Sequence, residues 1–233
     1  MPNPFRRSVS LEVGSLIPAI LLYLLSFTAS RAMAQSATPP KGLDKQLSRI
    51  DLAVNIAGSF TSSVSGNEQR DRTPLNISGS STVGEVFTLR YIAKPFVGFE
   101  LNLGNARYTQ NFIFGLPTQN YLPGGAQADV REETLGYVAH TRPIFGLQPY
   151  LGAGGGTIRF KPTRFGGQGL PQQYRAAYYY NGGVEDYFPT THLGVRVGFR
   201  QLIYLAPDFG QNYLTITRRA RTSEPTFGFF LRF

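Results

Sequence analysis

Apolar and polar residues alternate through most of the chain after residue 48, and no segment there keeps a helical period. The stretch 49–60 shows this most clearly, because Ile50, Leu52 and Val54 share one face of an extended chain while small and polar residues occupy the other. The same two-residue pattern recurs further along. We therefore predict eight strands, at about 49–60, 82–93, 96–106, 130–141, 148–160, 175–188, 192–204 and after residue 224.

The connections between these predicted strands alternate between short and long. The short ones contain Pro95, Pro143 and Pro189, and proline suits a tight turn. Short turns at one end and long polar loops at the other are typical of barrels that span an outer membrane. The sequence therefore predicts an all-β protein, an eight-stranded antiparallel transmembrane β-barrel with short periplasmic turns and longer extracellular loops. The long loops are expected at 61–78, 107–129, 161–174 and 205–224.

One face of almost every predicted strand carries bulky aliphatic and aromatic side chains, and a barrel of eight strands has little room for them inside. We therefore expect this face to meet lipid and the small and polar face to line the lumen. A soluble barrel with its apolar face inward is the alternative. The lipid-facing arrangement places these ionisable side chains in the lumen: Arg90, Glu100, Glu132, His140, Arg196, Arg200 and Arg232.

Charges inside so narrow a barrel need partners, because little water can solvate them there. We expect the arginines Arg90, Arg196 and Arg200 to form ion pairs in the lumen. The carboxylates expected to pair with them are Glu100 and Glu132. We interpret these five residues as a structural ionic network, and a gate or narrow ion path is the alternative.

The carboxyl-terminal strand carries apolar side chains at every second position, among them Phe229, Leu231 and Phe233. A soluble domain avoids such an apolar edge strand, because it invites association with other chains. In a closed membrane barrel, lipid covers the apolar face and a neighbouring strand pairs with the edge. The pattern therefore predicts that the last strand closes the barrel against the strand at 49–60.

The amino-terminal segment has the layout of a secretory signal peptide. Arg6 and Arg7 precede an apolar run at 16–27, and the segment 32–34 (AMA) fits a cleavage site. The run is shorter than the roughly 20 residues that a spanning helix needs, although a retained anchor is the alternative. We expect a signal peptide at 1–34, a periplasmic leader at 35–48 and the barrel domain at 49–233.

The chain has a formal net charge of +9 and contains no cysteine. The positive surplus indicates anionic partners. For an exported protein we expect these to be outer-membrane lipid and lipopolysaccharide, and no nucleic acid. Disulfides and thiolate metal sites are excluded, and the two histidines show no metal-ligand spacing. We therefore predict no metal and no cofactor.

A family resemblance rests on three segments, which are 95–101 (PFVGFEL), 149–154 (PYLGAG) and the terminal aromatic strand. With these segments the chain resembles the small outer-membrane β-barrels, the OmpA-like and OmpX-like eight-stranded family, over about 49–233. The resemblance implies localisation in the bacterial outer membrane. It also implies that the barrel assembly machinery recognises the terminal strand, with Phe233, Leu231 and Phe229 as the assembly signal.

Some barrels of this family's size modify lipid A, and hydrolysis by a serine nucleophile needs a base close to it. A His-x-Ser pattern would place serine two residues after His140 or His192, but those positions hold Arg142 and Gly194. We therefore predict no catalytic residues and no enzymatic activity. A lipid A-modifying enzyme is the less favoured alternative.

The predicted loops carry basic residues beside tyrosines, a composition enriched at recognition surfaces. We predict a non-enzymatic role in membrane integrity or in surface interaction through these loops, with a host or surface ligand as a candidate partner. The alternative is a narrow pore or the transport of small or hydrophobic solutes. The basic loop residues are Lys161, Arg164 and Arg175 in the third loop, and Arg218, Arg219 and Arg221 near Tyr213 in the fourth.

Overall fold

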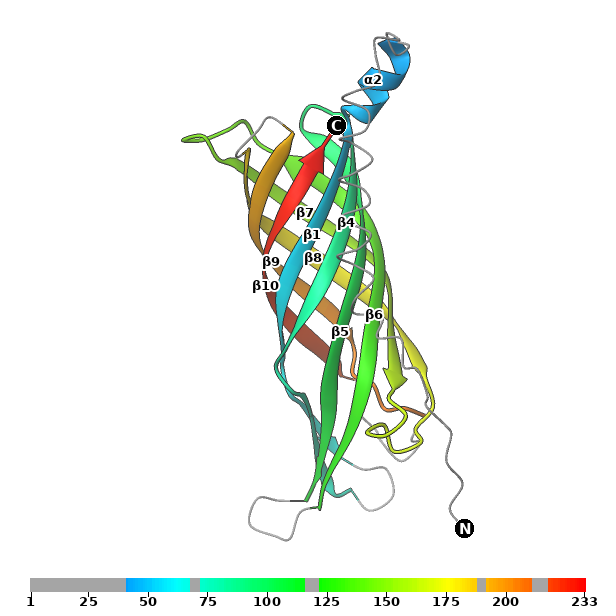
Figure 1. Cartoon of the computed structure of the whole chain (residues 1–233). Helices are drawn as coiled ribbons and strands as arrows, with labels where there is room; N and C mark the ends of the chain where they lie inside the picture. The colour runs from blue at the N-terminus through cyan, green and yellow to red at the C-terminus, as the bar shows by residue number, and fades with distance from the viewer. Residues whose placement is uncertain (1–40, 68–71, 116–121, 188–191, 211–217) are drawn as a thin grey trace, which may run out of the picture. The chain divides into compact units, whose positions relative to one another are not determined.

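The computed structural model describes residues 41–67, 72–115, 122–187, 192–210 and 218–233 (Figure 1). A short helix, α2 (Lys41–Leu47), precedes the first strand and lies within the segment expected to be a leader. None of the described helices is long and apolar enough to cross a membrane. The other described elements are strands, and they belong to a single antiparallel sheet.

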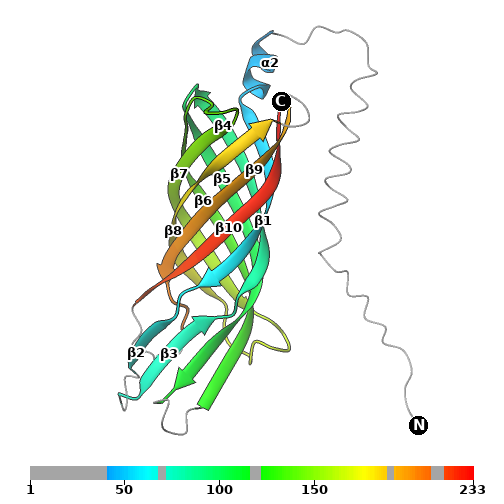
Figure 2. The same ribbon diagram turned by 90° about the vertical axis from the view of Figure 1, so that its left-hand side faces the viewer.

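Eight of the described strands close into a barrel, as predicted (Figures 1 and 2). The strand β1 pairs with β4 on one side and with β10 on the other, and the pairing of β5 with β6 completes the ring. Closure leaves the ring without an unpaired edge. The barrel strands are β1 (Ile50–Thr61), β4 (Thr82–Lys94), β5 (Val97–Phe114), β6 (Leu122–His140), β7 (Gln148–Pro162), β8 (Gln173–Tyr187), β9 (Leu193–Leu205) and β10 (Arg219–Arg232).

The closing pair joins the first barrel strand to the last one. Val54 lies opposite Phe229, and Leu52 lies opposite Leu231, in antiparallel register. The side chain of Phe229 faces outward and is 56% exposed. The prediction that the terminal strand closes the barrel is therefore confirmed.

Apolar side chains cover the outside of the barrel in a broad belt. On β6, Leu135 and Tyr137 are 60% and 64% exposed, and Leu151 on the neighbouring strand β7 is 71% exposed. Buried residues alternate with these exposed ones along each strand. An apolar outside over a lumen that holds charges is the arrangement of a barrel surrounded by lipid, and it contradicts the alternative of a soluble barrel.

Two of the expected loops consist largely of strands. The segment 61–78 contains the hairpin of β2 (Val64–Asn67) and β3 (Pro74–Gly79), and β3 pairs with the far end of β5. The strands β5 and β6 themselves run through most of the expected loop at 107–129. Figure 2 shows the hairpin and the ends of β5 and β6 extending beyond the other barrel strands.

A change of face along β5 explains why the sequence pattern concealed this extension. Apolar side chains face outward as far as Leu103, which is 43% exposed, whereas Tyr108 and Phe112 face inward and are buried. The pattern therefore breaks where the backbone continues as a strand. The expected fourth loop is also too long, because β10 begins at Arg219.

The lumen has two contrasting halves. We call the end where β1 begins and β10 finishes the turn end, and the opposite end of the barrel the loop end. Charged side chains fill the half toward the turn end, and a buried apolar cluster fills the half toward the loop end. The prediction of a small and polar lumen is therefore wrong for the loop-end half.

Candidate functional site in the barrel lumen

Arg90 on β4 is the centre of the charged half of the lumen. Its side chain is 1% exposed, and it lies opposite Asp51 of β1 and opposite Glu100 of β5 in the strand register. Its Nε donates to Glu100 Oε2 at 2.8 Å, and its Nη1 donates to Glu185 of β8. Arg90 therefore reaches across the lumen from one wall to another.

Asp51 and Glu185 bind the other arginines of this half. Arg196 Nε donates to Glu185 Oε1 at 2.8 Å, and its Nη2 donates to Asp51 Oδ1 at 3.1 Å. Arg232 Nη2 donates to Asp51 Oδ2 at 3.0 Å. Positive and negative groups alternate around the set, so each charge is compensated by its neighbours. We call it the turn-end cluster: Asp51, Arg90, Glu100, Glu185, Arg196 and Arg232.

A second ionic group, the middle cluster, lies closer to the loop end and consists of Glu132, Arg200 and Glu224. Arg200 Nη1 donates to Glu132 Oε2 at 2.7 Å and to Glu224 Oε2 at 3.1 Å, and its Nη2 also donates to Glu132. The Thr134 hydroxyl donates to Glu132 Oε1 at 2.7 Å. One guanidinium thus serves two carboxylates in this cluster.

The structure brings together the residues singled out from the sequence, with one different pairing. Arg90 contacts Glu100 and Arg200 contacts Glu132, but Arg196 contacts neither of these carboxylates. Its partners are Asp51 and Glu185, because Glu185 lies directly opposite Arg196 in the register of β8 and β9. The expectation that Arg196 pairs with Glu100 or Glu132 is therefore wrong.

Three carboxylates of the lumen were missed by reasoning from the sequence. Asp51 could have been identified, because the alternation places it on the small and polar face of its strand. Glu185 follows two glycines, Gly182 and Gly183, which obscure the parity of β8. Glu224 fell inside an expected loop, although it lies opposite Arg200 in the register of β9 and β10.

Two tyrosines stack against the buried arginines and occupy space that glycines leave open. The Arg90 guanidinium lies 4.4 Å from the ring centre of Tyr150, and that of Arg200 lies 4.9 Å from the ring centre of Tyr179. A Cβ atom on Gly198 would come within 2.5 Å of the Tyr150 hydroxyl oxygen. Glycine is therefore required there for the close approach of the ring to the barrel wall.

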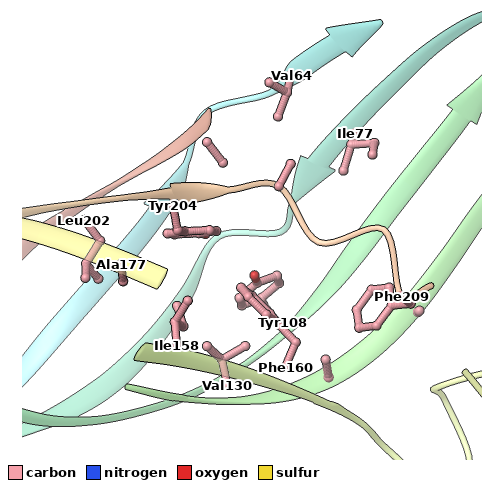
Figure 3. Close-up of a cluster of buried hydrophobic side chains, with 14 of the residues drawn as sticks. Val64, Ile77, Tyr108, Val130, Ile158, Phe160, Ala177, Leu202, Tyr204 and Phe209 are labelled. Atoms are coloured by element: carbon pink, nitrogen blue, oxygen red, sulfur yellow. The ribbon is translucent and has the colours of Figure 1, made fainter. Parts of the chain in front are cut away.

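The loop-end half of the lumen is filled by packed aromatic rings (Figure 3). Phe160 is fully buried, and its ring centre lies 5.6 Å from that of Tyr204 and 6.4 Å from that of Tyr108. Phe209, from the segment after β9, packs edge-on against Phe160 at 6.5 Å. We call these four residues, Tyr108, Phe160, Tyr204 and Phe209, the aromatic plug.

The segment after β9 is fastened so that Phe209 points into the barrel. The Gln173 side-chain oxygen accepts from the backbone N–H of Asp208 at 3.0 Å and from that of Phe209 at 3.1 Å. Asp208 also forms an ion pair with Arg175 at 3.0 Å. Phe209 has a φ of 51°, which is unusual for a residue other than glycine, and these contacts hold it there.

A cavity of about 30 Å³ lies between the charged half and the apolar half. Its lining includes Ser59, Glu132, Thr222 and Glu224, and the plug residues Tyr108 and Tyr204. A space of this size holds about two water molecules. Among the described residues, side chains of the middle cluster lie on its turn-end side, and side chains of the aromatic plug lie on its loop-end side.

The basic residues assigned to the loops lie in different settings. Arg175 is paired with Asp208, whereas Lys161, Arg164 and Arg218 are exposed. Arg219 and Arg221 are also exposed, but they belong to β10 and not to a loop. Tyr213 lies outside the described residues.

The remaining sequence-predicted residues lie at the turn end. His140 is buried, with Nε2 3.8 Å from Glu185 Oε2, and the Nδ1 of His192 lies 3.1 Å from the Arg232 carbonyl oxygen. Phe233 follows β10, and its N–H donates to the Ile50 carbonyl oxygen at 3.4 Å. Within the described ranges, no group of three or more His, Cys, Asp or Glu side chains could hold a metal ion.

No family model and no curated protein sequence matches the chain. Solved structures do match it. Neisserial surface protein A (NspA) superposes with a TM-score of 0.50 at 12% identity, over 79% of this chain and 97% of that one. The outer membrane protein OprG of Pseudomonas aeruginosa superposes with a TM-score of 0.50 at 15% identity, over 79% and 95%.

The chain has the fold of the small outer-membrane β-barrels. The apolar outer belt and the closed ring of eight described strands agree with this fold. This fold agrees with the expected localisation in the bacterial outer membrane.

Proposed function

We propose that this protein is a closed, non-conducting barrel that serves membrane integrity or surface interaction through its outer face and its loop end. The observation that supports this proposal most directly is the filled lumen. The turn-end cluster, the middle cluster and the aromatic plug follow one another along the barrel. The cavity between the middle cluster and the aromatic plug has a volume of only about 30 Å³.

The energetics of the clusters favour a closed state. A passing ion would have to separate guanidinium and carboxylate groups that are almost completely buried, such as Arg90 and Glu100. Separating a buried pair leaves charges uncompensated and costs about 3–5 kcal/mol. The alternative of a narrow ion path is therefore less favoured than the structural ionic network.

Conductance in planar lipid bilayers tests this proposal. The purified barrel is expected to show no steps in current across a range of voltages in which a porin conducts. Insertion into the bilayer is verified by the heat-dependent gel migration of the protein recovered from the same membranes. Steady conductance by the unmodified protein would refute the closed barrel.

Passage of a small apolar solute is the second candidate, and the apolar lining of the loop-end half favours it. Entry from the loop end would require Phe209 to move away from Phe160, and the bonds from Gln173 oppose that movement. Uptake of a hydrophobic fluorescent dye into cells would decide the matter. A rate that is raised by the protein and raised further by Phe209→Ala would establish transport.

We also propose that the protein is not an enzyme. His140 is buried beside Glu185 in the lumen, away from any outer-leaflet substrate, and the positions two residues beyond the histidines carry no serine. Mass spectrometry of lipid A from cells with and without the protein provides the test. A change in the acyl pattern would contradict the proposal.

A further inference from the structure

Two arginines face each other on the outside of the barrel. Arg131 of β6 lies directly opposite Arg159 of β7 in the strand register. Both point outward, because their chain neighbours Glu132, Ile158 and Phe160 are buried in the lumen. Directly opposed residues have Cβ atoms about 5 Å apart, and like charges in that arrangement repel.

Neither of these arginines has an ion-pair partner among the described residues. Asp129, on the same face of β6, is engaged by Arg107, whose Nε lies 2.5 Å from its Oδ1. Glu133, two residues along β6 from Arg131, forms no ion pair with either arginine in the described chain. The side chain of Arg131 is exposed and that of Arg159 is partly exposed. The two guanidinium groups can therefore be reached by an anion from outside the barrel.

The position of the pair relative to the apolar belt indicates what kind of anion this is. On β6 the outward side chains Tyr137 and Leu135 are apolar, and Glu133 and Arg131 follow immediately toward the loop end. In outer-membrane barrels, the boundary of the apolar band marks the level of the lipid headgroups. The arginines thus lie where a lipid carries its phosphate, next to apolar side chains that contact acyl chains.

We propose that Arg131 and Arg159 form a binding site for the phosphate group of an outer-leaflet lipid, with the exposed apolar residues of β6 and β7 holding its acyl chains. Two guanidinium groups can bind one phosphate through several charge-assisted hydrogen bonds. The bound anion also removes the repulsion between the two arginines. This site deepens the proposed surface role and rests on it, since it requires a barrel embedded in lipid.

Binding of purified lipid A to the refolded barrel in detergent micelles, followed by native mass spectrometry, tests the site. We expect diphosphorylated lipid A to bind with an apparent Kd at least about tenfold lower than its dephosphorylated form. The variant Arg131→Gln/Arg159→Gln should lose this preference. Arg131→Lys/Arg159→Lys should keep part of it, because charge remains while the planar donors are lost.

The matched control is Arg107→Gln. It removes a positive charge from the same outer face of the neighbouring strand β5, but from an arginine that is already paired with Asp129. This variant should keep the preference for phosphorylated lipid A. Each barrel is first shown to be folded by its heat-dependent migration in gels, and the single variant Arg159→Gln replaces the double variant if that fails to fold.

Three results would overturn the site. One is an unchanged preference in Arg131→Gln/Arg159→Gln. Another is an equal loss in Arg107→Gln, which would indicate a general effect of charge. The third is displacement of lipid A by millimolar inorganic phosphate, which would indicate a site for the free anion. None of these results depends on conductance. The closed-barrel proposal is therefore tested independently of the lipid site.

Discussion

Arg90 is almost completely buried and contacts two carboxylates, so its removal would leave Glu100 and Glu185 charged in a lumen with little water. We predict that Arg90→Ala lowers the free energy of unfolding by about 3–5 kcal/mol. Urea unfolding in detergent micelles, followed by far-ultraviolet circular dichroism, measures this loss.

The control for Arg90 is Arg107, which forms an ion pair of similar chemistry on the outer surface, where its side chain is 63% exposed. Arg107→Ala should cost at most about 1 kcal/mol, because water screens the pair. Equal losses for the two variants would contradict the structural role of the ionic clusters.

The middle cluster predicts an asymmetry between its two carboxylates. Glu132 accepts from both terminal nitrogens of Arg200 and from Thr134, whereas Glu224 accepts one hydrogen bond from Arg200. With one guanidinium for two carboxylates, neutralising one of them relieves repulsion. Glu224→Gln should therefore change the free energy of unfolding by less than about 1 kcal/mol, and Glu132→Gln should lower it by about 2–3 kcal/mol. The same urea titration measures both, and the opposite order would contradict this division of roles.

At the scale of elements, the hairpin of β2 and β3 is an addition to the barrel and not part of its ring. The strands β1 and β4 pair directly as far as Ser59 and Thr82, so the connection between them can be short. We predict that replacing residues 62–80 by a short glycine-containing turn leaves a folded barrel. Heat-dependent gel migration and circular dichroism measure this, and loss of the folded band would contradict it.

The same hairpin variant should be less stable than the complete chain. Val64, Leu75 and Ile77 of the hairpin are buried against the aromatic residues of the loop-end half, and their removal exposes apolar surface. We expect the variant to have lower thermal stability than the complete chain. The turn-end and middle clusters should remain intact, since they contain no residue of the hairpin.

Alternation with period two predicted the barrel strands because lipid and lumen impose opposite demands on successive residues. It failed where those surroundings change. Beyond Leu103 the outside of β5 carries Asn105 and Arg107 and the inside carries Tyr108, so apolar and polar residues exchange faces. Parity alone places the cluster arginines, Glu100 and Glu132 in the lumen. It does not place Glu185 or Glu224 there, and it does not give the partner of Arg196, which depends on the register between β8 and β9.

At the scale of the whole molecule, the role of Phe233 in assembly remains a prediction that a single deletion can test. Its side chain is 38% exposed, and it lies beyond the end of β10. Deleting Phe233 should therefore change the stability of the refolded barrel by less than about 1 kcal/mol, as surface changes generally do. The amount inserted in the outer membrane of cells should fall severalfold.

Quantitative immunoblotting of outer-membrane fractions, beside refolding in detergent, separates these two effects. Deletion of Phe145, an exposed residue of the connection between β6 and β7, is the control for loss of an aromatic residue at a turn. Failure to refold without Phe233 would show that it stabilises the barrel and would contradict a role confined to assembly.

The ion pairs of Asp51 cross the seam where the two ends of the sheet meet. Asp51 of β1 pairs with Arg196 of β9 and with Arg232 of β10. Arg232 lies directly opposite it in the strand register. A closure displaced by two residues would keep every side chain on its proper face and would restore the backbone hydrogen bonds. It would, however, set Arg232 against Ala53 or Arg49. It would also displace Arg196, so that Asp51 would lose both arginines that pair with it. The charges in the lumen thus favour the observed register between β1 and β10 over registers shifted by two residues. The backbone hydrogen bonds alone would not discriminate between these registers.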